Sequence, residues 1–429
     1  MKVLLLSQFY PPVIGGEERH VQALARALAG RGHEVSVATL ALDAGASTEM
    51  EDGIRIHRVR SSIQSLPRVF SDASRPYAPP APDPGLAAAL RRVVRAERPD
   101  VIHAHNWIVN SALPLRIGSP AALVLTLHDY GHACATRRLM RDGKPCSGPG
   151  LRRCLACAGR HYGAPLGSLA TVATLSLRAL KNRALDAVIA VSTAVAEGNR
   201  LPGSGVAFEV VPNFVDDSLW EAAGAPISDR HHPALPHEPF LLFAGDLSRE
   251  KGLHLLLDAY GRLRRRPPLV LMGRLTESTP AQLPAGVVRL LDCTHDLVME
   301  GFRRCEVAAA PSIWPDPCPT VVLEAMASGR PLVTTSIGGI TDMVVDGKSG
   351  LRVTPGDAQG LATAVARLLD DPELGHRLGA DGRARARDFT ASRVVPRIEA
   401  VYERAVRARR RAAAPEVASP PGGGVETWR

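Results

Sequence analysis

The chain has 429 residues and a formal net charge of +9 at pH 7. This length favours two domains of roughly 200 residues each, and hydrophobic and charged fractions of 45% and 22% are typical of a globular protein. Aromatic residues make up only 4% of the sequence, and the arginines are scattered apart from a run at 409–411. The positive charge therefore does not predict nucleic-acid binding, for which a recognisable motif and interleaved aromatic residues would be expected.

The first forty residues predict a βαβ unit. KVLLLS (residues 2–7) is a continuous apolar run, as in a parallel strand that is buried on both faces. A Pro- and Gly-rich turn follows, then a helix with Val21, Leu24 and Leu28 on one face, and EVSVATL (34–40) predicts the next strand. The opening apolar run is too short for a signal peptide, and no later segment has eighteen uninterrupted apolar residues. We therefore expect a cytoplasmic protein whose cysteines do not form disulfides by default.

Alternating strands and helices occur twice along the chain and predict an α/β protein. Short strand-like segments recur up to FEVVPN (208–213), periodicity then fails while Pro and His accumulate, and a second series starts at FLLFAG (240–245). Such a pattern predicts two doubly wound parallel sheets that face each other across a cleft. The expected units are a Rossmann-like domain at 1–215, a linker at 216–239, a second Rossmann-like domain at 240–388, a helix at 389–411 that packs back on the first domain, and a disordered tail at 412–429.

A Pro-rich segment at 311–319 precedes the most informative helix. This helix can begin only after Pro319, with Thr320 as its N-cap and Val321 next to it. Free backbone N–H groups and a positive dipole end make such a start a ready diphosphate site. Glu324 lies one turn further, where it can accept both hydroxyls of a ribose, and Asp316, seven intervening residues earlier, can reach hydroxyls of a sugar. The alternative is that Glu324 merely complements the helix dipole.

Residues 311–335 (PSIWPDPCPTVVLEAMASGRPLVTT) resemble the acid–seven–acid motif of the family 4 retaining glycosyltransferases, also called glycosyl transferases group 1. Further similar motifs occur in the family's order over roughly residues 1–405. They are PPVIGGEERH, RGHEVSV, PDVIHAHNW, TLHDY, AVSTAV, VPNFVD, GDLSREKGLHLLLDAY and GGITDMVVDGKSGLRVTPGD. The resemblance implies the GT-B fold and transfer of a hexose-type sugar from a nucleotide diphosphate sugar, a UDP- or GDP-sugar. The acceptor would be a glycan, a lipid-linked glycan or a small molecule, as in polysaccharide or glycolipid biosynthesis.

The resemblance also implies roles for single residues in the second domain. Lys251 matches a family Lys that holds the donor diphosphate, but the family Arg five residues earlier is Asp246 here. Arg249, on the same loop, is the candidate to replace the lost charge, since Arg suits bidentate contact with phosphate. Asp316 and Asp342 stand where the family usually has Glu, which keeps the charge and shortens the reach by one methylene.

In the first domain, Gly15 and Gly16 resemble the family's glycine loop, where the missing Cβ atoms let the backbone approach the donor. A plain strand-to-helix turn is the alternative. His128 matches a family His that contacts the donor sugar and helps to position the reaction, and its place at a strand end agrees with ligand binding there. His103 and His105 have no evident third metal ligand, and we interpret them as structural residues or as part of the acceptor site.

The resemblance implies retention of anomeric configuration and no catalytic metal, because the helix dipole and basic side chains neutralise the leaving diphosphate. A dinucleotide-dependent oxidoreductase is excluded because FYPPVIGGEE lacks the G-x-G-x-x-G spacing. An inactive nucleotide-sugar-binding or partner subunit of the same fold is the open alternative, motivated by Asp246. With a lipid acceptor, the basic surface would allow peripheral contact with the inner membrane face.

Four of the seven cysteines gather in a Gly-, Pro- and Arg-rich loop at 134–157. Four thiols at this spacing, two of them in CLAC, are typical of a closed structural zinc site. An iron–sulfur cluster, redox disulfides and unliganded thiols are the alternatives. The candidate ligands are Cys134, Cys146, Cys154 and Cys157.

Overall fold

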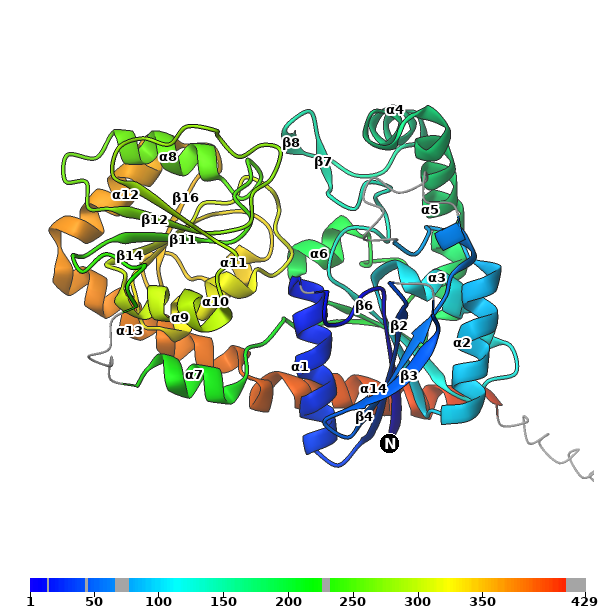
Figure 1. The fold of residues 1–429 in the computed structure, drawn as a ribbon. Coiled ribbons are helices and arrows are strands. Elements are labelled where there is room, and N and C mark those ends of the chain that lie inside the picture. Colours follow the sequence, from blue (N-terminus) through cyan, green and yellow to red (C-terminus); the bar gives the residue numbers. More distant parts are fainter. Residues whose placement is uncertain (14, 43–44, 66–76, 226–231, 414–429) are drawn as a thin grey trace, which may run out of the picture.

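The computed structural model describes residues 1–13, 15–42, 45–65, 77–225 and 232–413. Two largely parallel β-sheets lie side by side, each covered by helices, and a long C-terminal helix runs beneath the first sheet (Figure 1). The predicted α/β architecture of two Rossmann-like units is confirmed.

The first sheet has eight strands in the order β10-β9-β6-β5-β1-β2-β4-β3. All neighbours are parallel except β3, which pairs antiparallel with β4 at the edge. Without its two edge strands the order is that of a doubly wound dinucleotide-type sheet, with the direction of winding reversing between β1 and β5. The strands are β1 (Lys2–Ser7), β2 (Glu34–Leu40), β3 (Ser47–Glu51), β4 (Ile54–Val59), β5 (Val101–His105), β6 (Ala122–Leu127), β9 (Ala187–Ala190) and β10 (Phe208–Val210).

The second sheet repeats this order in six parallel strands, β13-β12-β11-β14-β15-β16, and reverses between β11 and β14. In doubly wound sheets, ligands bind beyond the carboxyl ends of the strands at such a reversal. The strands are β11 (Leu241–Ala244), β12 (Leu269–Gly273), β13 (Val287–Leu291), β14 (Val307–Ala310), β15 (Leu332–Thr335) and β16 (Leu351–Val353).

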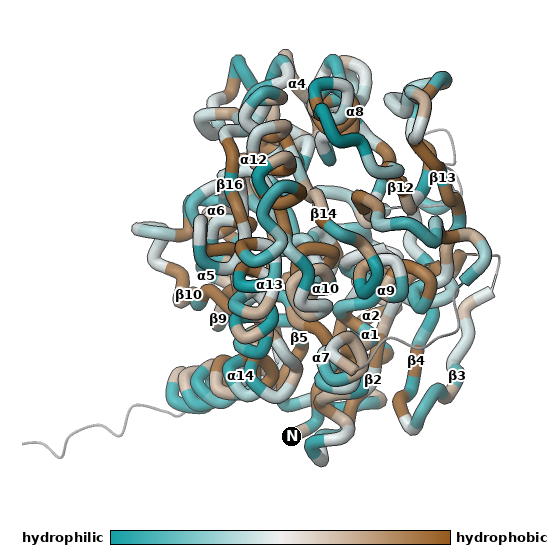
Figure 2. The backbone as a smooth tube through the Cα atoms, turned by 90° about the vertical axis from the view of Figure 1, so that its left-hand side faces the viewer, coloured by the Kyte–Doolittle hydropathy of each residue, from teal (hydrophilic) through white to brown (hydrophobic). Residues whose placement is uncertain are grey.

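Helices cover both faces of each sheet, which explains why the central strands are apolar and buried, whereas the edge strand β3 is polar and exposed. In β1, Val3 and Leu5 pack against one helical layer, whereas Leu4 lies in the core on the other face. In Figure 2 the strands are mainly hydrophobic, while the covering helices mix hydrophobic and hydrophilic residues. The helices are α1 (Gly16–Gly30), α2 (Pro84–Glu97), α3 (Val109–Ala112), α4 (Leu151–Tyr162), α5 (Ala164–Ala184), α6 (Thr193–Gly198), α7 (Asp217–Ala223), α8 (Leu253–Gly261), α9 (His295–Arg304), α10 (Thr320–Ala327), α11 (Ile340–Met343), α12 (Ala358–Asp370), α13 (Pro372–Ala386) and α14 (Ala391–Ala413).

The C-terminal helix α14 returns to the first sheet, as predicted. Its buried residues Val394, Ile398 and Tyr402 share a core with β1 and α1. The segment predicted as the linker, 216–239, contains the helix α7. Asp216 is the N-cap residue of this helix and has an extended conformation. The predicted disordered tail lies outside the described residues from 414 onward. Among the described helices, none has both the length and the apolar character that crossing a membrane requires.

Candidate active site

The loop after β11 is fastened to the loop after β14 at the reversal point of the second sheet. The carbonyl of Glu250 accepts hydrogen bonds from the backbone N–H groups of Ile313 and Trp314, at 2.9 and 3.2 Å. Gly252 has a positive φ of 82°, and a Cβ at this position would lie 1.8 Å from the carbonyl oxygen of Pro311. Only glycine fits both conditions, so the two loops can touch only with Gly252 in place.

This contact brings Lys251 to Asp316. The Lys251 ammonium forms an ion pair with the Asp316 carboxylate and lies 5.3 Å from the centre of the Trp314 ring. The Asp316 side chain is buried, whereas that of Lys251 keeps 28% of its surface exposed. Two residues that the sequence assigned separately to diphosphate and sugar therefore lie side by side.

The helix α10 begins at Thr320, directly after this pair. The structure places Pro319 at the N-cap position, without a side-chain hydrogen bond, so the expectation that Thr320 caps the helix is wrong. Thr320 is instead the first helical residue, because Pro319 holds the extended conformation that a cap needs. The amides of Thr320 and Val321 precede the first intrahelical hydrogen bond and keep their donors available.

Glu324 is buried one turn into α10, and its Oε1 lies 3.0 Å from Nε2 of His295, the first residue of α9. The hydrogen bond to Glu324 raises the pKa of His295, while desolvation by burial opposes the shift. The sequence did not single out His295. Its contact leaves the second carboxylate oxygen, Oε2, for a ligand.

The basic side chain that lies beside Asp246 is Arg274. In the parallel pair β11–β12, residue 244 lies opposite residue 272, so residues 246 and 274 follow as neighbours. The guanidinium of Arg274 contacts Asp246 Oδ1 through Nε at 3.0 Å and Nη2 at 2.9 Å. The side chain of Arg249, which was predicted to replace the lost charge, is exposed and has no ion pair with any described residue.

The glycine loop ends at the start of α1. Gly15 is the N-cap residue, and a Cβ there would lie 2.4 Å from Glu18 Oε2. A Cβ on Gly16 would meet nothing within 4 Å. A side chain at Gly15 would have to displace the Glu18 carboxylate, whereas Gly16 borders open space that a ligand backbone or phosphate could enter.

His128 follows β6 and belongs to a cluster of histidines at the carboxyl ends of β5 and β6. Its Nε2 lies 2.9 Å from His105 Nδ1, and its ring centre lies 4.9 Å from that of His20. Burial, with a smaller contribution from His103, lowers the pKa of His128 to about 3, so the ring is neutral at pH 7. Its Nδ1 has no hydrogen bond of good geometry among the described residues, and the nearby Asn213 side chain opposes the lowering of its pKa.

His103 and His105 are both fully buried. His103 is held between the hydroxyls of Tyr402 and Thr126, both at 2.7 Å. His105 is fully buried and supports His128. The contact with Tyr402 links α14 to the strand that carries these histidines.

Glu17 and Asn106 are further site residues that the sequence did not reveal. Asn106 donates to Glu17 Oε2 at 2.6 Å and accepts the backbone N–H of His128 at 3.0 Å, so it joins the glycine loop to His128. Burial, reinforced by the Glu18 charge, raises the pKa of Glu17 to about 8. The other oxygen, Oε1, is buried without a hydrogen-bond partner in the described structure. The only sequence signal was the position of each residue directly after a strand or turn.

The carboxyl ends of the two sheets meet around these residues. The Tyr130 hydroxyl donates to the carbonyl of Pro315 at 2.6 Å, and Trp314 Nε1 donates to the carbonyl of Arg138 at 2.7 Å. Asp342, which replaces a family Glu, accepts the backbone N–H of Thr193 at 2.6 Å. His128 and the Lys251–Asp316 pair thus belong to one junction between the two domains.

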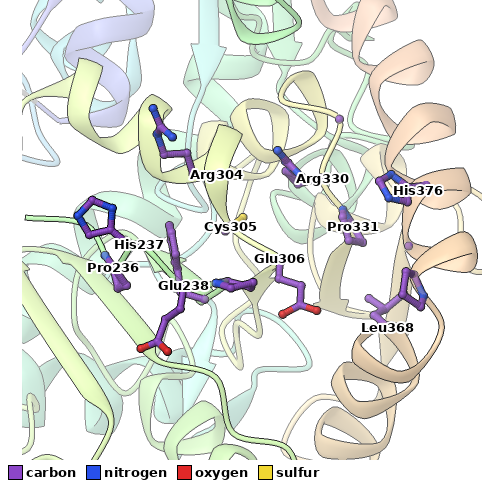
Figure 3. A pocket seen from close by; sticks show the side chains of 15 residues that line it. Pro236, His237, Glu238, Arg304, Cys305, Glu306, Arg330, Pro331, Leu368 and His376 are labelled. Atoms are coloured by element: carbon purple, nitrogen blue, oxygen red, sulfur yellow. The ribbon is translucent and has the colours of Figure 1, made fainter. Parts of the chain in front are cut away.

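A separate cavity of about 370 Å³ lies in the second domain (Figure 3). Glu238, Glu306 and Pro331 line it, and each precedes a strand of the second sheet. It therefore opens at the amino ends of the strands, opposite the carboxyl ends where doubly wound sheets bind ligands. We do not assign it to the site.

Two family models match the chain. Residues 227–385 match "Glycosyl transferases group 1" and residues 14–219 match "Glycosyltransferase Family 4". A glycogen synthase of Mycobacterium tuberculosis is 31% identical over 96% of both chains. The protein is a family 4 glycosyltransferase of group 1. A D-inositol 3-phosphate glycosyltransferase of Pseudarthrobacter chlorophenolicus is 28% identical over 88% of both chains.

Solved structures of low identity share the fold of this glycosyltransferase. Sucrose-phosphate synthase of Thermosynechococcus elongatus has a TM-score of 0.72 at 20% identity. The match covers 96% of this chain and 100% of the synthase chain. The Anabaena protein HepE, solved with UDP and glucose, has a TM-score of 0.64 at 20% identity, over 94% of this chain and 99% of its own. These structures confirm the predicted GT-B fold. The family matches and the 31% identical relative confirm the predicted nucleotide-sugar-dependent glycosyltransferase activity.

Proposed function

We propose that this enzyme is a retaining glycosyltransferase that moves a hexose-type sugar from a UDP- or GDP-sugar to a hydroxyl of a glycan, a lipid-linked glycan or a small molecule. One observation carries the proposal: the Lys251–Asp316 pair directly precedes the open end of α10, with Glu324 one turn further. The cation and the positive helix end come first and suit a diphosphate, and the carboxylate that follows suits the ribose.

The donor would lie along this order. The Lys251 ammonium and the free amides of Thr320 and Val321 would bind the diphosphate, and Glu324 Oε2 would accept ribose hydroxyls. Asp316 would accept sugar hydroxyls, its position fixed by Lys251. Arg274 and the exposed Arg249 are the basic residues that would approach the diphosphate from the neighbouring loops.

The first domain would present the acceptor from the opposite side. Gly16 leaves room for the donor, and neutral His128 offers its Nδ1 to the donor sugar. In the reaction, the bond between the anomeric carbon and the diphosphate oxygen breaks. The acceptor oxygen bonds to that carbon on the same face, and its proton passes to the departing phosphate oxygen. Lys251 and the end of α10 stabilise the leaving charge, so the step needs no metal.

UDP is the first donor base to test, because the similarly folded HepE was solved with UDP and with UDP-glucose. A thermal-shift panel of UDP-, GDP- and ADP-sugars identifies the base, since a ligand at 100 times its Kd stabilises the protein by about 2.7 kcal/mol. The donor then enters transfer assays with candidate acceptors, in which NMR reads the anomeric configuration of the product.

Variants test the assigned site in the same assay. Lys251→Ala and Glu324→Ala should each lower the rate by ~10²–10³, the scale for losing one charge-stabilising group. Brief treatment with a chelator, which removes loosely bound divalent ions, should leave the rate unchanged. The exposed Lys348→Ala is the matched control for Lys251→Ala. Full activity of both site variants would refute the assignment, and inversion of configuration would refute retention.

The alternative of an inactive partner subunit predicts donor binding without either transfer or donor hydrolysis. It was motivated by the loss of a basic residue at position 246, and Arg274 supplies a basic side chain at that place. We also propose that the enzyme acts in the cytoplasm and contacts the inner membrane face when its acceptor is lipid-linked. Co-sedimentation with anionic vesicles at low but not high salt would support this contact.

A further inference from the structure

The segment 134–162, here called the Cys lobe, has almost no hydrophobic core of its own. It contains a short hairpin of β7 (Met140–Arg141) and β8 (Lys144–Pro145) followed by α4, at the top of the first domain in Figure 1. Ala158 is the only buried residue of α4, and the local core consists of three alanines with Tyr162 packed against them. At about 25 cal/mol per Å² of buried apolar surface, three methyl groups stabilise a segment very little.

The backbone of the Cys lobe needs support for a second reason. Arg137, Leu139 and Asp142 all have positive φ, between 51° and 65°. This left-handed conformation is unfavourable for residues with a Cβ. A segment with these turns and so little apolar packing requires another source of order.

Four cysteine thiols lie close together in this weakly packed segment. Cys134 follows β6, Cys146 follows β8, and Cys154 and Cys157 lie one turn apart on α4. All four line a single cavity of about 20 Å³, close to the volume that one water molecule needs. None of the four is in a disulfide.

We propose that Cys134, Cys146, Cys154 and Cys157 bind one Zn²⁺ in a closed, structural site. The cavity between the four cysteines has room for one small ion. Zn²⁺ accepts four thiolates at about 2.3 Å in tetrahedral geometry. Such a complex carries two negative charges, and two cations, Arg141 and Arg153, line the same cavity.

On metal binding, the thiols would exchange their present hydrogen bonds for bonds to the metal. The Cys146 thiol donates to the carbonyl of Gly148 and the Cys157 thiol to that of Met140, at 3.5 and 3.8 Å. Accordingly, in the described ranges no three His, Cys, Asp or Glu side chains are placed as ligands of one ion. The thiols would reorient towards the ion, and each would release its proton to solvent on binding. The backbone N–H of Gly150 already donates to Cys154 Sγ at 3.4 Å, a contact that favours the thiolate.

The site would order the edge of the active site without touching substrate. Arg138, four residues after Cys134, forms an ion pair with Glu250 and accepts the Trp314 indole N–H on its carbonyl. Trp314 in turn packs on Lys251. Zinc would therefore act as a positioning element for the donor loop through the Cys lobe.

The proposal is tested by metal analysis of the full chain, purified under reducing conditions without added metal. We expect about one zinc per chain, retained by Cys293→Ser and lost from Cys154→Ser and Cys157→Ser. Cys293 is the control because it lies far along the chain, with the same intermediate exposure. Since the lobe variants could unfold, the wild-type chain is also loaded with Co²⁺, whose thiolate charge-transfer and tetrahedral ligand-field bands report four sulfur ligands directly.

Other outcomes overturn the proposal. Metal-free protein with seven alkylatable thiols would show unliganded cysteines, stoichiometric iron with acid-labile sulfide would show a cluster, and blocked thiols released by reductant would show disulfides. None of these readouts depends on enzymatic activity. The zinc proposal and the proposed glycosyltransferase function can therefore be refuted independently of each other.

Discussion

Asp246 and Arg274 follow neighbouring parallel strands in register and form an ion pair, with both guanidinium contacts on one carboxylate oxygen. The acid stands where the resemblance implies an Arg, and Arg274 on the next strand end places a cation beside it. The pair therefore keeps a cation at the carboxyl end of the second sheet. We expect Arg274 to contribute to donor binding.

The first prediction concerns this cation. Arg274→Ala should weaken donor binding by roughly tenfold or more, because hydrogen bonds to charged groups contribute about 1.5–3 kcal/mol. The double variant Asp246→Arg, Arg274→Asp should restore most of the affinity, since it reverses the pair without removing a charge. Calorimetric titration with the donor measures both.

Arg249→Ala is the informative comparison in that titration. Arg249 was chosen from the sequence because it lies on the loop of Lys251, yet no described residue pairs with its side chain. A larger loss of donor affinity for Arg249→Ala than for Arg274→Ala would contradict the role of Arg274 and assign it to Arg249.

The second prediction separates two glycines of α1. A methyl group on Gly16 would meet no protein atom within 4 Å, and the same holds for Gly30 at the other end of the helix. Both Gly→Ala variants should fold, and each could gain up to about 1 kcal/mol of helix propensity. Only Gly16→Ala should raise the KM for the donor, by several-fold, because its methyl group occupies space that the donor needs. Equal KM values for the two variants would indicate that the glycine loop is a strand-to-helix turn that does not contact the donor.

The fold was largely predictable because alternating apolar strands and amphipathic helices carry their own signal. Residues 2–40 alone specify a βαβ unit, and its repetition predicts two doubly wound sheets. Glu324 could be found because it lies one turn into a helix that starts after prolines, whereas Lys251 was found only through the resemblance of its segment to the family motif. The N-cap at Thr320 was misplaced by one residue, since Pro319 can hold an extended cap conformation without a side-chain hydrogen bond.

The partners of these residues could not be predicted, because they depend on tertiary geometry. Arg274 lies beside Asp246 only through the register of β11 and β12. His295 reaches Glu324 across 29 residues of chain, and Asn106 reaches Glu17 across 89. No local spacing encodes such contacts.

The third prediction concerns the histidine that contacts Glu324. The hydrogen bond to Glu324 is the first cause of the raised pKa of His295, so Glu324→Gln should lower that pKa towards or below the value of free histidine. NMR titration of the imidazole protons measures it, with His295→Asn identifying the resonance. Glu300→Gln is the control, since Glu300 lies on the same helix but pairs with Arg304 at 2.8 Å. An unchanged pKa in Glu324→Gln would mean that the two side chains do not interact in solution.

The fourth prediction is a pH dependence of stability that originates at Glu17. The pKa of Glu17 is about 8 in the folded protein, against an ordinary value of 4.5. Between pH 4.5 and pH 8 the folded chain therefore keeps a proton on Glu17 that the unfolded chain has lost. The stability contributed by this group is complete below about pH 4.5 and is lost as the pH rises towards 8. Each unit of pKa difference corresponds to about 1.4 kcal/mol.

Glu17→Gln removes the titration and keeps an amide oxygen for Asn106. The variant should therefore gain stability relative to the wild type as the pH rises from 5 to 8, by an amount on the order of a few kcal/mol. Urea denaturation at both pH values measures the free energy of unfolding. A stability difference that is equal at the two pH values would show that Glu17 is ionised in the folded protein, and that its buried Oε1 has a partner such as solvent.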